Sequence, residues 1–341
     1  MTRQPLFRRF EGNPILTAGE WPYTVNVVFN PGVALLPSGE TVLLVRVEDR
    51  SGVSHLTVAR SSNGYKDWRI DPHPSFEPES DRYEETWGIE DPRITLVGDE
   101  YLITYTGFSR GGPLVCLAAT RDFHTFERRA VLMPPEDKDA ALFPRQFDGR
   151  WALIHRPVTS GAHRLAAHMW LSFSPDLRHW GDHRILLHAR EGSWWDADRV
   201  GLGPPPLLTE CGWLLLFHGV KRTAAGSLYR AGLALLDPED PARVLVRSNE
   251  WVFGPEAAYE RTGDVPDVIF PTGWVLEPDG RTIRMYYGAA DTSVAVANAD
   301  LEALLGFVLS HCVCEKTHEP GEFCAQAARG IVTSTPSHVI T

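Results

Sequence analysis

The sequence lacks any apolar run long enough to cross a membrane. Its apolar runs, such as the segment GWLLLF at 212–217, are far shorter than the roughly 20 residues that a membrane-spanning helix needs. No apolar segment follows the basic residues of the first ten positions, so a secretory leader is not predicted either. These absences predict a cytoplasmic protein that has no membrane partner.

The sequence also has no excess of basic residues. It carries 33 Lys and Arg against 44 Asp and Glu, a formal net charge of −11 over 341 residues. Such a balance argues against nucleic acid or an anionic membrane as a partner of the surface as a whole. Disorder is excluded as well, because 43% hydrophobic and 10% aromatic residues can bury enough surface to offset the entropy of ordering.

Cysteine is scarce, and its pattern does not suggest disulfide bonds. There are five cysteines, an odd number, and Cys116 and Cys211 lie inside apolar, strand-like segments. Reduced thiols are therefore predicted. The remaining cysteines, near the end of the chain, are Cys312, Cys314 and Cys324. Two histidines nearby, His311 and His318, could join Cys312 and Cys314 around a metal, but this spacing matches no common zinc pattern and we predict no metal.

Few segments show helical periodicity. Instead, a short sequence pattern, called here the repeated phrase, recurs along the chain. In this phrase a turn glycine precedes a strand rich in β-forming residues that ends at a polar or aromatic residue. It occurs five times, at 39–46, 98–105, 149–156, 212–218 and 280–287. Successive glycines are about 50 to 70 residues apart. A second phrase, at 62–68, 120–126 and 174–180, has the composition of a hairpin turn with an aromatic residue anchoring the outer edge.

Five units, each with room for four short strands, are typical of blades stacked around an axis. We therefore predict an all-β fold, a five-bladed β-propeller forming one catalytic domain over residues 1–310. A short helix is expected at 299–309, where Leu301, Leu304, Leu305 and Val308 share one face. Residues 311–341 show no pattern and are predicted to form a loosely ordered C-terminal tail.

Polar residues at the ends of the repeated strands are the first candidates for a site. Arg46, Arg156 and His218 end three of these strands, and Asp291 follows a fourth. Taken singly, each is more often a surface or ion-paired residue. Their recurrence at one place in successive repeats, however, predicts that they converge at the mouth of a central channel. Basic groups gathered there on an acidic protein would suit a small anion such as phosphate.

Several segments of the chain form distinct motifs: NPG at 30–32, RVE at 46–48, GIEDPR at 88–93, KDAALFP at 138–144, HRP at 155–157, RVGLGPP at 199–205, GWLLLFHGV at 212–220 and YYGAADT at 286–292. Together they resemble the motifs of glycoside hydrolase family 130, the β-mannoside phosphorylases. The resemblance covers about residues 10–308, and the motifs occur in the family's order. The family fold is a five-bladed β-propeller, which agrees with the count of repeats.

The resemblance implies a role for each matching residue. Asp91 corresponds to the general acid. The residues that correspond to the mannosyl-binding positions are Asn30, Arg46 and Asp291. Those that correspond to the phosphate-binding positions are Lys138, Arg156, Arg199 and His218. Lys138 stands where Arg is common and Arg199 where Lys is common, so the positive charge is kept although the geometry of the donors differs.

These roles imply inverting phosphorolysis of a β-mannoside to α-mannose 1-phosphate and a shortened acceptor sugar. Inorganic phosphate is the co-substrate, and no cofactor is required. An inverting β-mannoside hydrolase is the nearest alternative, and it would need a second carboxylate about 6.5 to 9.5 Å from the acid; Asp196 and Asp198 are candidates for this base. A non-catalytic carbohydrate-binding propeller is a further alternative. The sequence leaves open the acceptor, the choice between β-1,4 and β-1,2 linkages, and association into homo-oligomers.

Overall fold

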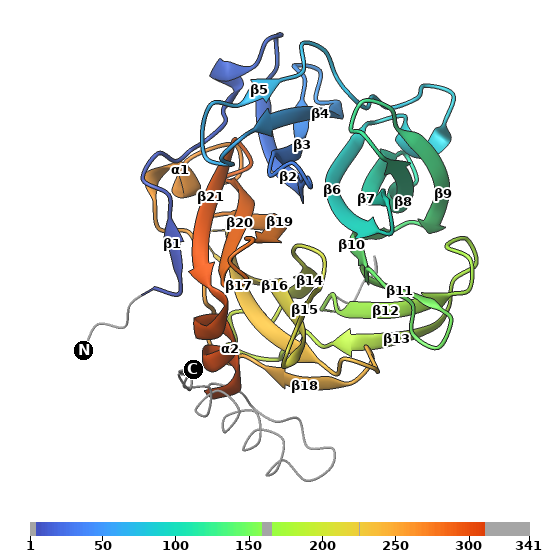
Figure 1. Ribbon diagram of the computed structural model, residues 1–341, viewed down its shortest axis with the longest axis vertical. Helices are drawn as coiled ribbons and strands as arrows, with labels where there is room; N and C mark the ends of the chain where they lie inside the picture. The colour runs from blue at the N-terminus through green and yellow to red at the C-terminus, as the bar shows by residue number, and fades with distance from the viewer. Residues whose placement is uncertain (1–4, 159–165, 225, 311–341) are drawn as a thin grey trace, which may run out of the picture.

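Five antiparallel sheets stand around a common centre, as Figure 1 shows. The computed structural model describes residues 5–158, 166–224 and 226–310. Each sheet contains at least four strands, and the few helices lie outside the sheets. The predicted all-β, five-bladed propeller is therefore confirmed. The tail at 311–341, with its cysteines and histidines, lies outside the described residues.

Four blades follow one another along the chain. Blade 1 consists of β2 (Val27–Leu35), β3 (Thr41–Glu48), β4 (Ser54–Ser61) and β5 (Arg69–Ile70). Blade 2 consists of β6 (Ile89–Val97), β7 (Glu100–Ser109), β8 (Gly112–Thr120) and β9 (Glu127–Met133). Blade 3 consists of β10 (Asp137–Leu142), β11 (Trp151–Pro157), β12 (Met169–Ser174) and β13 (Gly181–Leu187). Blade 4 consists of β14 (Arg199–Leu202), β16 (Gly212–Thr223), β17 (Gly226–Leu236) and β18 (Val244–Arg247), with β15 (Leu207–Thr209) also paired to β16.

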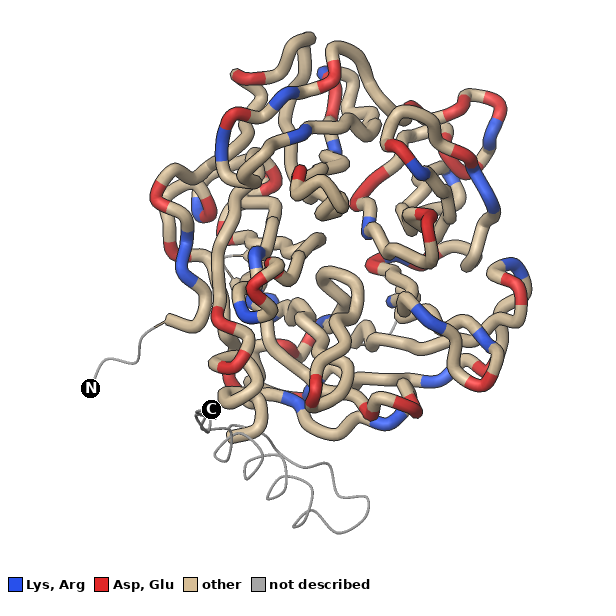
Figure 2. The backbone as a smooth tube through the Cα atoms, viewed as in Figure 1, with Lys and Arg blue, Asp and Glu red and all other residues tan. Residues whose placement is uncertain are grey.

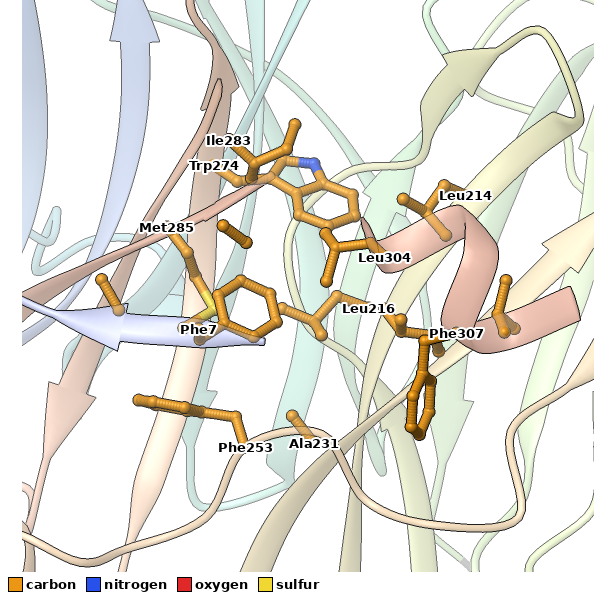
Figure 3. Packing of buried hydrophobic residues seen from close by; sticks show 14 of the residues in the cluster. Phe7, Leu214, Leu216, Ala231, Phe253, Trp274, Ile283, Met285, Leu304 and Phe307 are labelled. Carbon is orange, nitrogen blue, oxygen red and sulfur yellow. The ribbon is translucent and has the colours of Figure 1, made fainter. Parts of the chain in front are cut away.

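Blade 5 joins the two ends of the described chain. It consists of β19 (Ile269–Leu276), β20 (Thr282–Ala289), β21 (Ser293–Asp300) and β1 (Phe7–Arg9). Phe7 of β1 packs among residues of blades 4 and 5, close to Met285 and Phe253 (Figure 3). Arg9 donates from Nε to Oε1 of Glu260 at 2.7 Å, and Glu260 is fully buried. The ring is thus closed by an N-terminal strand of three residues, which the repeat analysis did not reveal.

The repeated phrase of the sequence forms the second strand of each blade. The first strand, closest to the centre, precedes it in every case: β2, β6, β10, β14 and β19. The second strand is buried on both faces because it lies between two neighbouring blades. In β3, Leu44 packs in a cluster with blade 2, whereas Leu43 packs in a cluster with blade 5. Burial of both faces explains why these strands appear in the sequence as nearly continuous apolar runs.

The second phrase forms the turn between the third and fourth strands, as predicted. It follows β4, β8 and β12 and precedes β5, β9 and β13. In the third copy, Oδ1 of Asp176 accepts hydrogen bonds from the backbone N–H groups of Arg178 and His179. The aromatic residues that end the three copies are partly buried against the blade cores: Trp68, Phe126 and Trp180.

The helices are short. In the part of the chain that the structure describes, they are two 3-10 turns, η1 (Ala18–Glu20) and η2 (Tyr83–Glu85), and two α-helices, α1 (Ala258–Arg261) and α2 (Leu301–Ser310). In α2, Leu304, Leu305 and Val308 are buried, and Asp300 precedes the helix and accepts from the N–H of Ala303. The predicted helix at 299–309 is thus confirmed, with a start two residues later. Among the described residues, no helix is long and apolar enough to span a bilayer.

Acidic and basic residues are interspersed along the outer loops of all five blades (Figure 2). Buried Cys116 and Cys211 are unpaired, as predicted. Burial raises the pKa of Cys116 to about 12, so this thiol stays protonated.

Candidate active site

All eight residues singled out in the sequence line one cavity of about 280 Å³. They come from all five blades: Asn30, Arg46, Asp91, Lys138, Arg156, Arg199, His218 and Asp291. Further residues of the same lining are Glu136, Asp139, Tyr229 and Phe270, which the sequence analysis did not single out. The structure therefore brings together the complete predicted set and adds two carboxylates and two aromatic rings.

Three innermost strands place a polar residue at the same local distortion. The strand register breaks between Phe29 and Gly32 in β2, between Glu90 and Arg93 in β6, and between Lys138 and Ala141 in β10. Inside these bulges lie Asn30, Asp91 and Asp139, with φ values of 44°, 50° and 55°. Asn and Asp adopt this left-handed conformation more readily than most residues. A bulge re-aims a side chain that a regular strand would direct at the neighbouring blade.

The second strands of three blades supply basic residues of the site. Arg46 on β3 pairs in register with Phe29 and Arg156 on β11 with Lys138, each next to a bulge. His218 on β16 pairs with Gly201 of β14, where the register is continuous. The recurrence of polar residues at strand ends thus reflects a geometric equivalence between these three blades.

Asp91 lies within a network of hydrogen bonds and charges. Its Oδ1 accepts from Nδ2 of Asn30 at 2.9 Å and from Nη1 of Arg46 at 3.0 Å. Nζ of Lys138 lies 4.0 Å from Oδ2. Burial by itself would raise the pKa of Asp91, but the charges of Arg46, Lys138 and Arg93 outweigh it and hold the pKa below its usual value.

A second carboxylate, Asp139, organises the other half of the cavity. Its Oδ2 accepts from Nε of Arg156 at 2.6 Å and lies 3.3 Å from Nε2 of His218. Although burial opposes ionisation, Arg156 and His218 hold the pKa of Asp139 well below its usual value. Burial lowers the pKa of His218, and the neighbouring Asp139 only partly opposes this shift. A methyl group at Gly201 would lie 2.5 Å from Asp139 Oδ2, so only glycine permits the contact between Asp139 and His218.

Arg93 connects the two halves beneath the cavity. It is almost fully buried, and its Nη1 donates to the backbone oxygen of Asp91 at 2.7 Å. Its Nη2 lies 3.7 Å from Oδ1 of Asp139. Arg93 is the last residue of the motif at 88–93 and was not among the candidate site residues. In the structure its charge faces Asp139 and the backbone of Asp91.

Asp291 has the opposite electrostatic character to Asp91. Burial, and then the nearby charge of Asp91, raise its pKa to about 6. It lies just after β20 with a φ of 48°. The cavity thus contains two carboxylates that stay ionised, Asp91 and Asp139, and one, Asp291, that takes up a proton in mildly acidic solution.

The two candidate bases for hydrolysis do not line this cavity. Asp196 is fully buried, and its Oδ2 accepts from Nη2 of Arg247 at 2.6 Å. Asp198 lines an adjoining groove, where its Oδ2 accepts from the backbone N–H of Arg222. Within residues 5–158, 166–224 and 226–310, no group of three or more His, Cys, Asp or Glu side chains is arranged to hold a metal ion.

Comparisons with known proteins agree on one family. The family model for glycoside hydrolase family 130, described as beta-1,4-mannooligosaccharide phosphorylase, matches residues 2–310. A beta-1,2-mannobiose phosphorylase of Listeria innocua is 38% identical over 255 residues, which are 75% of this chain and 69% of that protein. A beta-1,4-mannooligosaccharide phosphorylase of Ruminococcus albus is 33% identical over 309 residues, which are 89% of this chain and 91% of that protein.

Solved structures give the same result. The beta-1,2-mannobiose phosphorylase from Listeria innocua, solved with beta-1,2-mannobiose, superposes with a TM-score of 0.80 at 31% identity and covers 89% of this chain and 99% of its own. A structure from a study of family members that are hydrolases of beta-1,2 mannosidic linkages has a TM-score of 0.77 at 26% identity, covering 88% and 95% of the two chains. Because the match in sequence and structure extends over nearly the whole propeller, the chain belongs to glycoside hydrolase family 130.

Proposed function

We propose that the protein catalyses reversible, inverting phosphorolysis of a β-mannoside, yielding α-mannose 1-phosphate and a shortened acceptor sugar. The observation that carries this proposal is the composition of the cavity. Four groups that can be cationic, Lys138, Arg156, Arg199 and His218, line the same small space as Asp91. Arginine and lysine donors gathered in this way suit a phosphate ion. A carbohydrate-binding site alone would not need them.

The residues of the cavity form two groups, one for each substrate. Asn30, Arg46 and Asp291 would hold the mannosyl unit, and the basic cluster would hold phosphate on the face of the anomeric carbon opposite the leaving group. An oxygen of hydrogen phosphate forms a bond to that carbon as the bond to the acceptor oxygen breaks. Asp91 supplies the proton that the acceptor oxygen takes, directly or through a sugar hydroxyl, and regains one from the hydrogen phosphate. Positioning and charge compensation provide much of the rate.

This chemistry needs no metal or organic cofactor, because phosphate is already an anionic nucleophile. We therefore propose that the enzyme works with inorganic phosphate alone as co-substrate. Activity that survives exhaustive treatment with EDTA is the expected result. Loss of activity that Mg²⁺ or Zn²⁺ restores would contradict it.

The reaction is tested by product analysis on the purified protein. The substrates should include β-1,2- and β-1,4-mannobiose, because relatives named for both linkages match the chain. Mannose 1-phosphate should form from at least one of them, and only when phosphate is present. Equal cleavage without phosphate, giving free mannose, would establish the hydrolase instead.

The synthetic direction gives an independent test and defines the acceptor. Mannose 1-phosphate is incubated with a panel of mannose, glucose and manno-oligosaccharide acceptors, and phosphate release is followed. The panel is broad because the sequence leaves the acceptor open. Failure with every acceptor, combined with success for another sugar 1-phosphate, would overturn the assignment to mannose.

A further inference from the structure

Asp139 occupies the same place in blade 3 that Asn30 and Asp91 occupy in blades 1 and 2. All three lie in a bulge of the innermost strand, all have a positive φ, and all line the cavity. The sequence contains the signal for this equivalence, because Asn30-Pro31, Asp91-Pro92 and Asp139-Ala140 align when the repeats are superimposed on their register breaks. The symmetry of the fold thus adds a third residue to the two that the family resemblance identifies.

Asp139 contacts two side chains of the cavity and Arg93 beneath it. Its side chain is completely buried, and Oδ2 contacts Nε of Arg156 and Nε2 of His218. Burying the guanidinium of Arg156 without a counter-charge would be costly, and Asp139 supplies that charge. Oδ2 contacts Arg156 through Nε, which leaves the two terminal nitrogens of the guanidinium outside this hydrogen bond.

The polar atoms left over beside Asp139 point to a ligand. Among the described residues, Nη1 of Arg156 and Nδ1 of His218 are buried and have no hydrogen-bond partner. Oδ1 of Asp139 also has none within that part of the chain. Buried polar atoms without partners are rare in folded proteins and call for an explanation. A hydrogen phosphate ion in this cavity would accept a hydrogen bond from Nη1 of Arg156 and donate its O–H to Nδ1 of His218, which is the acceptor of a neutral ring whose Nε2 faces Asp139.

We propose that Asp139 is a positioning residue of the phosphate site, holding Arg156 and His218 so that Nη1 of Arg156 and Nδ1 of His218 are directed at the phosphate. This inference rests on the proposed phosphorolysis. It assigns to a carboxylate a part in binding an anion, which charge alone would not suggest. The carboxylate acts through the orientation of its two partners.

Three variants separate orientation from charge. Asp139→Ala removes both the charge and the hydrogen-bond acceptor. Asp139→Asn removes the charge but keeps an oxygen for Nε of Arg156, and Asn tolerates the positive φ. Gly201→Ala keeps the charge but places a methyl group within 2.5 Å of both Asp139 Oδ2 and the ring of His218. The matched control is Asp196→Asn, a fully buried carboxylate that binds Arg247 outside the cavity.

The experiment measures KM for phosphate and for the β-mannobiose that the wild type cleaves. Loss of a hydrogen bond to a charged group predicts that Asp139→Ala raises KM for phosphate about ten-fold or more. KM for the disaccharide should stay within about two-fold, since Asp139 contacts none of the predicted mannosyl-binding residues. Asp139→Asn should recover most of the loss, and Gly201→Ala should raise KM for phosphate selectively. Asp196→Asn should change neither KM.

Each contrary result has a defined meaning. An unchanged KM for phosphate in Asp139→Ala, an equal rise of both KM values, or an Asp139→Asn variant as impaired as Asp139→Ala would overturn the proposal. If Asp139→Ala does not fold, Gly201→Ala decides, and an unchanged KM for phosphate in that variant overturns the inference.

A measurement that needs no turnover keeps the two proposals apart. Inorganic phosphate should raise the Tm of the wild type and of Asp196→Asn, because a ligand that binds only the folded state stabilises it. The rise should be lost in Asp139→Ala and kept in Asp139→Asn. A wild type that binds phosphate but does not use it to cleave mannosides would refute the proposed function alone. A rise kept in Asp139→Ala would refute the positioning role alone.

Discussion

Nη1 of Arg46 lies 3.0 Å from Oδ1 of Asp91, the carboxylate proposed to donate a proton. This guanidinium and the ammonium of Lys138 lower the pKa of Asp91 although the group is buried. A general acid must carry a proton at the moment of bond cleavage. The field around Asp91 must therefore change when the substrates bind. In the proposed reaction phosphate would provide that change, because its negative charge beside Lys138 would offset the cations that keep Asp91 ionised.

Phosphate binding should accordingly be coupled to proton uptake by Asp91. Calorimetric titrations of phosphate, performed at about pH 5 in buffers of different ionisation enthalpy, measure the protons taken up per phosphate bound. The wild type should take up more protons than Asp91→Asn, in which the titrating group is absent. Equal uptake by the two proteins would show that Asp91 does not respond to phosphate.

Replacement of Asp91 by Asn should nearly abolish turnover and leave the fold intact. The amide is nearly isosteric, tolerates the φ of 50°, and can keep the contact to Asn30 after rotation. A missing general acid typically costs about 10² to 10⁴ in rate, and we expect a loss in this range. KM for phosphate should not rise, because the neutral amide does not repel the anion. Rates of mannose 1-phosphate formation provide the measurement. Unchanged turnover would remove Asp91 from its proposed role.

The five-bladed fold could be predicted from the sequence because each copy of the repeated phrase can be recognised in its own short segment. Each turn glycine and each apolar second strand can be recognised without knowledge of its partners, and five copies predict five blades. Arg46, Arg156 and His218 were found for the same reason, since they end copies of one strand. The three-residue strand that closes the ring contains no copy of this phrase. Its pairing with residues 297–299 depends on contacts almost 300 positions away.

Asp139 could not be singled out from the sequence, for a different reason. It lies within the recognised motif at 138–144, yet an acidic residue is not expected at a site for an anion. Its role depends on the bulge that turns it toward Arg156 and on the absence of a side chain at Gly201. Neither feature can be derived from the residue types alone. The equivalence of Asp139 with Asn30 and Asp91 becomes visible when the bulges are superposed, and this superposition requires the register of the strands.

A methyl group at Gly288 should impair catalysis by displacing Asn30. The added carbon would lie 1.9 Å from Oδ1 and 2.9 Å from the backbone nitrogen of Asn30, which binds Asp91. A displacement of about 1 Å in a site can cost about 10² in rate, and we expect Gly288→Ala to lower kcat/KM for the mannoside by that order. The control is Gly181→Ala, because the new methyl group would meet no atom within 4 Å. Similar activity in the two variants would contradict the packing argument.

Replacement of Arg9 should destabilise the protein by weakening the contacts through which β1 closes the ring of blades. Arg9 donates from Nε and Nη2 to both carboxylate oxygens of buried Glu260, and its guanidinium stacks on Phe253 at 4.3 Å. Leaving a buried carboxylate without its cation typically costs about 3 to 5 kcal/mol, so Arg9→Ala should lower the free energy of unfolding by about 3 kcal/mol. Urea denaturation measures this change. The exposed residue Arg110 serves as control, and equal effects of Arg110→Ala and Arg9→Ala would contradict the closure argument.

Asp291 should make the protein less stable as pH rises. Its replacement by Asn should raise stability at neutral pH and lower activity. In the folded protein its pKa is raised from 3.8 to about 6, so between these values the native state holds a proton that the unfolded chain has released. Stability contributed by this proton is present below about pH 4, falls as pH rises to about 6, and is absent at pH 7. A shift of about two pKa units corresponds to about 3 kcal/mol.

Asp291→Asn stays neutral at every pH, and Asn accepts the φ of 48° at this position. The variant should therefore match the wild type in Tm at about pH 4 and exceed it increasingly toward pH 7, where the buried charge of Asp291 destabilises the wild type. Its kcat/KM for the mannoside should fall, because the charge that destabilises the fold is the one available to a sugar hydroxyl. A Tm difference that is constant with pH would show that Asp291 does not titrate in this range. Unchanged activity would show that its ionised form has no part in binding the sugar, and the burial of a carboxylate there would then need a different cause.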